Sequence, residues 1–170
     1  MPSLTNLLRS ELRSAQRICV LGVGSDLRGD DAVGLVVAAR LRKALRRRTV
    51  CVLNGGTAPE NLTGEIRRFD PSHLLIVDAL DSPGAPGPGS VVLLAPDEIT
   101  GPSFGTHKLP IKLMVRYLLH SLPGRRILIV GIQPKSLAMA PMGLGMAPLT
   151  RPVAAAATRL TRALLAAIRQ

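Results

Sequence analysis

The chain has 170 residues, a length that suits one compact domain with a sizeable core. Its hydrophobic content of 46% excludes a disordered tail, and with only 2% aromatic residues the interior must be filled by aliphatic side chains. The net charge of +11 means that an acidic partner or a nucleic acid has to be considered. No apolar run reaches the roughly 18 to 20 residues of a membrane span, and residues 1–16 lack the apolar core of a signal peptide. We therefore expect a soluble cytoplasmic protein with no membrane partner.

The N-terminal part of the chain predicts two helices and two strands. Leucines at helical spacing predict a helix over residues 4–15, and the nearly unbroken apolar run over 17–23 predicts a strand buried on both faces. A glycine-rich turn follows, and a second helix is expected over 32–46. A second buried strand is expected over 49–54.

The middle of the chain predicts a helix and the most apolar strand. Thr57, with Glu60 three residues further on, matches a capping box and predicts a helix that ends near Arg68. The strand over 73–79 closes on Asp78.

The remainder of the chain continues the same alternation. A short edge strand, antiparallel in our interpretation, is expected over 90–94, a helix over 109–122, a long strand over 126–132 and a closing helix over 152–169. The segment 135–149 is rich in Met, Gly and Pro and is expected to be an apolar loop, including Met139, Met142 and Met146.

Strands that alternate with helices predict an α/β fold. We expect a three-layer α/β/α sandwich with a mainly parallel twisted sheet of about five strands and helices on both faces. The expected organisation is a single domain over 1–170, in which 1–16 is a helical addition ahead of a core over 17–170.

Three polar residues are expected at the carboxyl-terminal edge of this sheet, where α/β proteins bind their ligands. Asp31 follows the first strand, Asp78 ends the third strand, and His107 precedes the helix before the last strand. Two carboxylates and an imidazole suit a divalent metal such as nickel or zinc. Their spacing alone is weak support, because any doubly wound protein has polar residues at this edge.

Other polar residues have simpler interpretations. Asp30 is expected to cap the helix that follows it, and Asp81 to form a turn. His73 and His120 are expected to be surface histidines. Cys19 and Cys51 lie inside predicted strands and are expected to be reduced, packed thiols rather than nucleophiles or metal ligands.

Two features could indicate a nucleotide or a nucleic acid. Gly22-Val-Gly24 begins like a dinucleotide fingerprint, but the third glycine would fall on Leu27, and no acid follows at the ribose position. The basic cluster over 40–48 is most simply a solvated helix end, with an acidic protein partner or a nucleic acid as alternatives. Because stacking aromatics are almost absent, we do not expect a nucleic-acid partner.

Taken together, the motifs resemble the hydrogenase maturation endopeptidases. The resemblance rests on Gly22-x-Gly-Ser-x-Leu-x-Gly-Asp-Asp-x-x-Gly34, Val77-Asp78-Ala79 and Thr106-His107. Three further segments are similar to the subgroup that serves the hydrogenase of formate hydrogenlyase: Asn54-Gly-Gly-Thr-Ala-Pro-Glu-Asn61, Thr106-His-Lys-Leu-Pro110 and Gly131-Ile-Gln-Pro134. The resemblance runs from about residue 18 to residue 148.

This resemblance implies a protease that removes the C-terminal extension of a nickel–iron hydrogenase large-subunit precursor after nickel insertion. It implies that Asp31, Asp78 and His107 contact nickel held in the precursor, so that the protein needs no tightly bound metal of its own. The alternative is a metal-dependent chaperone that binds the same precursor without cutting it. The chain departs from the family at Ser25, where Asn is usual, and at Ala32, where Gly is frequent. Ser25 can keep the loop hydrogen bonds, and Ala32 requires a turn without a strongly positive φ.

Overall fold

The computed structural model describes residues 3–82, 84–100, 109–140 and 147–169. A five-stranded sheet in the order β2-β1-β3-β5-β4 forms its centre. The strands are β1 (Ile18–Val23), β2 (Val50–Gly56), β3 (His73–Ala79), β4 (Val91–Leu94) and β5 (Arg126–Ile132). All neighbours are parallel except β4, which runs antiparallel to β5. The prediction of a mainly parallel sheet with a short antiparallel edge strand is confirmed.

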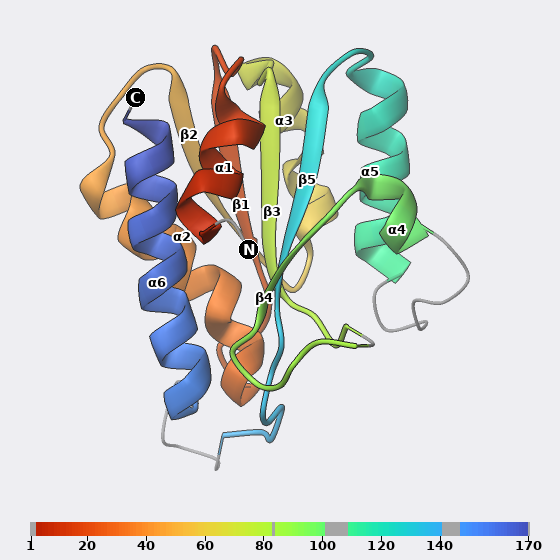
Figure 1. The fold of residues 1–170 in the computed structure, drawn as a ribbon. Coiled ribbons are helices and arrows are strands. Elements are labelled where there is room, and N and C mark those ends of the chain that lie inside the picture. The colour runs from red at the N-terminus through yellow and green to blue at the C-terminus, as the bar shows by residue number, and fades with distance from the viewer. Residues whose placement is uncertain (1–2, 83, 101–108, 141–146, 170) are drawn as a thin grey trace.

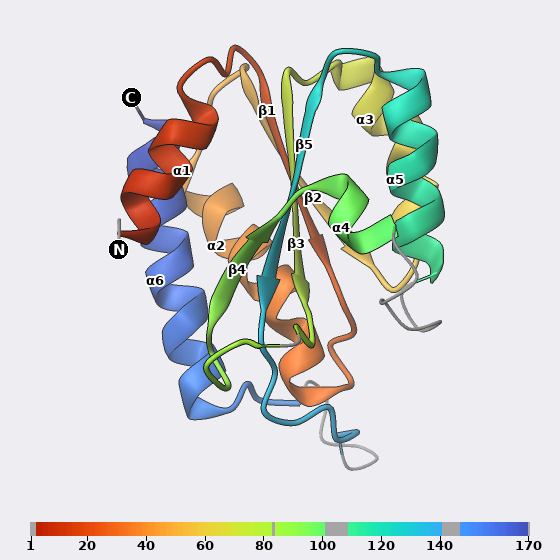
Figure 2. The same ribbon diagram turned by 45° about the vertical axis from the view of Figure 1, so that its right-hand side comes forward.

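Helices cover both faces of this sheet, as Figures 1 and 2 show. On one face lie α1 (Leu4–Leu12), α2 (Val33–Ala44) and α6 (Arg151–Ile168). On the other lie α3 (Thr63–Phe69), α4 (Pro96–Thr100) and α5 (Leu109–Ser121). Two short 3₁₀ turns, Gly29–Ala32 and Pro59–Leu62, precede α2 and α3. The expected three-layer α/β/α sandwich is therefore confirmed.

The two cores follow from the alternation of side chains along the strands. All six residues of β1 are buried. Ile18 and Val20 pack toward α2 and α6, whereas Cys19, Leu21 and Val23 pack toward α3 and α5. A strand covered on both faces needs apolar residues at every position, which explains the unbroken apolar run.

The N-terminal helix contributes directly to one of these cores. Leu8 is fully buried and Leu12 is 5% exposed, and both belong to the cluster that contains Leu160 and Leu164 of α6. Helix α1 thus covers apolar surface that α6 would otherwise expose to water. Within the described residues, no helix has the length and apolar character needed to cross a membrane.

The capping-box prediction is wrong. The 3₁₀ turn Pro59–Leu62 is preceded by Ala58, α3 is preceded by Leu62, and neither N-terminus has a side-chain cap. Strand β2 continues through Gly56, so Thr57 lies one residue before the position from which a hydroxyl could cap the turn.

Candidate functional site

Two glycines fold the segment after β1 tightly against the sheet. Gly24 has a φ of 137°, and a Cβ atom there would lie 1.7 Å from the carbonyl oxygen of Asp31. A Cβ atom at Gly34, in the first turn of α2, would lie 2.2 Å from the carbonyl oxygen of Val77 on β3. The glycine pattern therefore serves close backbone packing, and it brings the 3₁₀ turn that carries Asp31 into contact with β3.

The Asp31 carboxylate is oriented by the turn itself. Its Oδ2 atom accepts a hydrogen bond from the backbone N–H of Ser25 at 2.9 Å, and the Ser25 hydroxyl accepts one from the N–H of Leu27 at 3.3 Å. Ser25 thus keeps the loop hydrogen bonding that we expected. Ala32 has a φ of −70°, in the right-handed helical region, so this departure from the family is also accommodated.

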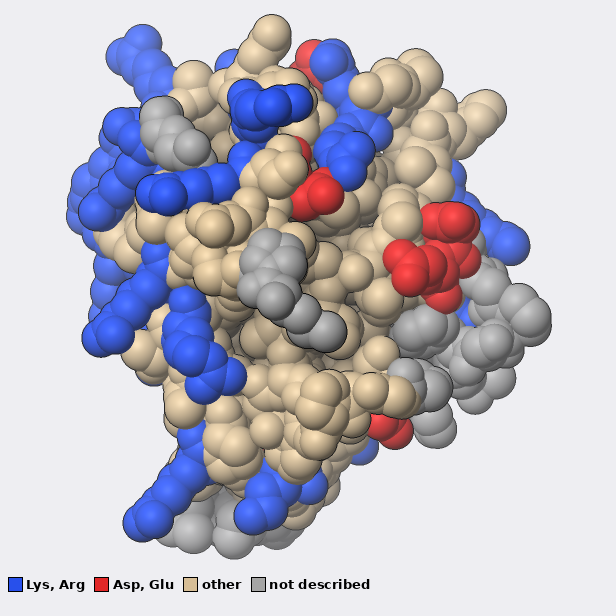
Figure 3. Space-filling model, viewed as in Figure 1, with Lys and Arg blue, Asp and Glu red and all other residues tan. Residues whose placement is uncertain are grey.

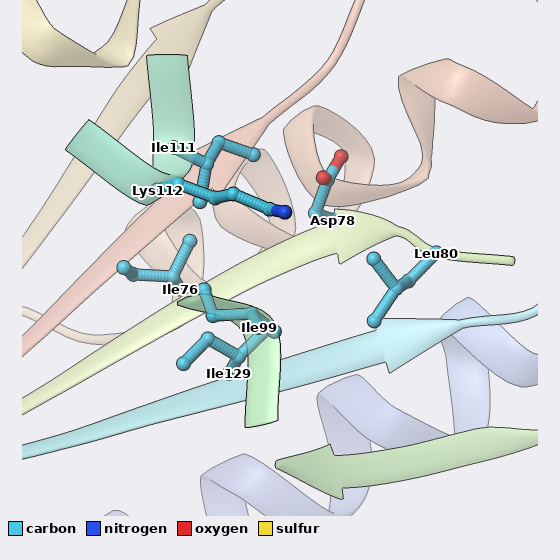
Figure 4. A pocket seen from close by; sticks show the side chains of 7 residues that line it. All are labelled: Ile76, Asp78, Leu80, Ile99, Ile111, Lys112 and Ile129. Atoms are coloured by element: carbon cyan, nitrogen blue, oxygen red, sulfur yellow. The ribbon is translucent and has the colours of Figure 1, made fainter. Parts of the chain in front are cut away.

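Asp78 lies at the end of β3, the strand beside β1, and is only 1% exposed. It forms part of the wall of a small pocket, shown in Figure 4. The other residues that line this pocket are Ile76, Leu80, Ile99, Ile111, Lys112 and Ile129. Asp31 and Asp78 therefore lie at the same edge of the sheet, as the sequence predicted.

His107 lies outside the described residues. Helix α5 begins two residues after it, and Ile111 and Lys112 of this helix line the pocket that contains Asp78. Among the residues that the structure does describe, no three His, Cys, Asp or Glu side chains are grouped so that they could hold a metal ion. The assignment of His107 to this site remains a prediction.

Asp30 does not cap α2, and that prediction is wrong. Its side chain is completely buried and accepts four hydrogen bonds: from the backbone N–H groups of Lys135, Ser136 and Thr150 and from the Thr150 hydroxyl, at 2.7 to 2.9 Å. Burial alone would raise the pKa of this carboxyl, but the bonds from Thr150, Ser136 and Lys135 outweigh burial and lower the pKa below its usual value. The carboxylate fastens both ends of the segment 135–150 to the turn after β1.

Backbone contacts join the same two segments. The N–H of Asp30 donates to the carbonyl oxygen of Ser136, that of Ala140 to Leu27, and that of Ala147 to Asp26. The described parts of the apolar loop predicted over 135–149, residues 135–140 and 147–149, therefore lie beside the candidate site. Met139 in this loop is 66% exposed, while Met142 and Met146 lie outside the described residues.

Comparisons with known proteins identify the family of this chain. A family model described as hydrogenase maturation protease matches residues 35–167. The chain belongs to the hydrogenase maturation protease family. The matched stretch includes Asp78 and His107 and begins four residues after Asp31.

Individual relatives support the same assignment. A hydrogenase maturation protease of Methanocaldococcus jannaschii is 32% identical over 82% of this chain and 85% of that protein. The Hydrogenase 3 maturation protease of Escherichia coli K12 is 34% identical over 68% of this chain and 71% of that protein. The crystal structure of the [NiFe] hydrogenase maturation protease HycI from Thermococcus kodakarensis matches with a TM-score of 0.85 and 29% identity, over 96% of this chain and 99% of that chain. As a member of this family the protein is a peptidase, and the non-catalytic chaperone alternative is not favoured.

The two cysteines of this family member are placed away from the site. Cys19 is fully buried, Cys51 is partly buried, and both are free thiols. They lie side by side on neighbouring strands, and the hydrogen bond to Cys51 together with burial raises the pKa of the Cys19 thiol. The expectation of reduced, packed thiols agrees with these positions.

The histidine predictions had mixed outcomes. His120 is exposed on α5, as expected. His73 is only 5% exposed, so its assignment to the surface is wrong. It begins β3 at the opposite end of the strand from Asp78, between β1 and β5, and neighbours on both sides cover it.

The remaining surface predictions hold. The Asp81 carboxylate accepts a hydrogen bond from the side chain of Gln133 at 2.8 Å, and Gln133 also accepts one from the N–H of Ser82, which fixes the turn after β3. The basic cluster at the end of α2 is exposed, while Leu41 and Leu45 beside it are buried. Figure 3 shows basic side chains along this side of the molecule.

Lys112 is the member of the pocket that sequence reasoning missed. It follows Ile111 on a helix whose inward positions are otherwise apolar, and both residues line the pocket. The sequence did contain a signal for this position. Lys112 lies five residues after the candidate ligand His107, beside the inward positions of an otherwise apolar helix.

Proposed function

We propose that this protease removes a C-terminal extension from the large-subunit precursor of a nickel–iron hydrogenase after nickel has been inserted. The observation that carries the proposal is that two acidic side chains lie at one edge of the sheet in a member of the hydrogenase maturation protease family: Asp31 in the 3₁₀ turn after β1, and Asp78 at the end of the neighbouring parallel strand β3. The Hydrogenase 3 relative agrees with the formate-hydrogenlyase subgroup. We place the reaction in the cytoplasm.

Asp31, Asp78 and His107 are proposed to contact nickel that belongs to the precursor. Carboxylate and imidazole groups are suitable ligands for this metal. The hydrogen bond from the Ser25 N–H holds one oxygen of Asp31 in place, and β3 fixes the backbone of Asp78. The nickel is then a recognition element of the substrate.

The reaction is peptide hydrolysis. Water adds to the carbonyl carbon of the scissile bond, the C–N bond breaks, and the amine leaves with a proton. A carboxylate at the sheet edge can accept the proton of the water and return it to the amine. Nickel held by Asp31, Asp78 and His107 would supply Lewis acidity, either to polarise the scissile carbonyl or to activate the water.

Intact mass spectrometry of the precursor tests this proposal. We expect the wild-type protein to release one C-terminal peptide from nickel-loaded precursor and none from the nickel-free form. Asp31→Asn, Asp78→Asn and His107→Ala should each reduce the initial rate by about 100-fold or more, because positioned acid–base groups contribute about 10² to 10⁴.

Two matched controls separate this effect from a general one. Asp81→Asn changes an exposed carboxylate just beyond β3, and His120→Ala changes an exposed histidine on α5. Both should process the precursor at the wild-type rate. Full processing by the three site variants would refute the residue assignment, whereas stable complex formation without a mass change would support the chaperone.

A further inference from the structure

The pocket beside Asp78 contains a cation supplied by the protein itself. Lys112 lies on α5, which is fixed against the sheet by Met114, Val115 and Leu118, each at most 2% exposed. Figure 4 shows the Lys112 side chain extending across the pocket with its terminal nitrogen on the side of Asp78. The ammonium group is thus directed to the part of the pocket where the proposed substrate metal would approach.

The rest of the pocket wall cannot solvate a charge. Among the lining residues that the structure describes, the only charged ones are Asp78 and Lys112, and the others are isoleucine and leucine side chains. Burial of a carboxylate such as Asp78 is unfavourable unless hydrogen bonds or a cation compensate for the lost water. An apolar wall also weakens dielectric screening, so charges across this pocket interact more strongly than charges on the surface.

We propose that Lys112 is a specificity residue that keeps free divalent metal ions out of the Asp78 site. A metal ion from solution would have to approach Asp78 against the repulsion of the Lys112 ammonium. A metal ion held in the precursor brings its other ligands with it, and the precursor's contacts compensate for displacement of the lysine side chain. The inference rests on the proposed function, since it assumes that the metal arrives within the substrate.

Titration calorimetry with nickel chloride alone tests this inference without a precursor. Lys112→Met removes the charge and keeps the apolar stem of the side chain. We expect it to bind Ni²⁺ about tenfold more tightly than the wild-type protein, or better, because one positive charge has been removed from a poorly screened pocket. Lys112→Arg keeps the charge and should bind as weakly as the wild type.

A second pair of variants locates the effect. The gain should disappear when Lys112→Met is made in the Asp78→Asn background. Lys135→Met, which removes an exposed lysine from the same end of the sheet, should leave Ni²⁺ affinity unchanged. If Lys112→Met does not fold, as judged by circular dichroism, Lys112→Gln replaces it.

Three calorimetric results would overturn the inference: an increase in Ni²⁺ affinity below tenfold in Lys112→Met, an equal increase in Lys135→Met, or an increase that persists in the Asp78→Asn background. Failure of the wild-type protein to process any precursor would instead refute the proposed function, and the calorimetric comparison of the variants would be unaffected by that result.

Discussion

The substitution Asp30→Asn should loosen the segment 135–150 from the turn after β1. One carboxylate oxygen accepts bonds from the N–H groups of Lys135 and Ser136 and from the Thr150 hydroxyl, and the other accepts the Thr150 N–H at 2.7 Å. Asparagine retains a single acceptor oxygen, so its amide would face a donor at one of these positions. Loss of the charge and of at least one buried bond should lower the free energy of unfolding by about 2 to 4 kcal/mol.

Thermal and urea unfolding followed by circular dichroism measure this loss. For a chain of this size, a loss near 3 kcal/mol corresponds to a fall in Tm of roughly 6 to 12 °C. Hydrogen exchange at the amides of Ser136 and Thr150 should become faster. The control Asp81→Asn keeps an oxygen that can accept the exposed hydrogen bond from Gln133, and it should change stability by less than about 0.5 kcal/mol.

The effect of Asp30→Asn should also depend on pH with a definite sign. The pKa of Asp30 is lower in the folded protein than its usual value, so the unfolded chain takes up the proton first. The stabilisation is therefore fully present above the unfolded pKa of about 3.9 and is lost as the pH falls through the folded pKa. A wild-type minus Asp30→Asn difference below 1 kcal/mol at pH 7, or one that does not shrink in acid, would refute this reasoning.

Two further substitutions test the packing and the buried histidine. Gly34→Ala should destabilise the protein by about 2 to 4 kcal/mol in urea unfolding, because its Cβ would overlap the Val77 carbonyl. Gly64→Ala on α3, where a Cβ would meet only the end of the Arg68 side chain at 3.9 Å, should be neutral or stabilising by up to about 1 kcal/mol. Equal effects of the two substitutions would contradict the packing argument. Burial lowers the pKa of His73, so stability should fall as the pH drops below about 6.5. His73→Gln should weaken that dependence in thermal unfolding and His120→Gln should not; an unchanged pH profile in His73→Gln would contradict the assignment.

Local sequence patterns were sufficient to predict the helices and strands and to place Asp31 and Asp78 at one edge of the sheet. The unbroken apolar runs identify strands buried on both faces. The order of Asp31 after the first strand and Asp78 at the end of the third predicts that both lie at the carboxyl-terminal edge of the sheet, where the structure has them. These features are encoded within about ten residues each, because side-chain periodicity reports burial directly. The capping-box prediction failed because β2 ends at Gly56, two residues beyond its predicted end, and Thr57 then lies one residue before the cap position at Ala58.

The partners of Asp30 were decided only by the tertiary structure. The donors, Lys135, Ser136 and Thr150, lie 105 to 120 residues away in the chain. Every residue except proline has a backbone N–H group, so the sequence does not distinguish the ones that bond to Asp30. The local pattern of Asp30 before a helix favoured an N-cap, but the tertiary donors satisfied its carboxylate instead. The burial of His73 likewise depends on the strand order, which places β1 and β5 on either side of it.

The sequence by itself determined which residues form strands, which edge of the sheet carries Asp31 and Asp78, and which family the protein resembles. Tertiary structure alone decided that Lys112 faces the pocket of Asp78 and that Asp30 holds the segment 135–150. Periodicity is a property of neighbouring residues, whereas the pairing of a buried charge depends on which distant segments the packed layers bring together.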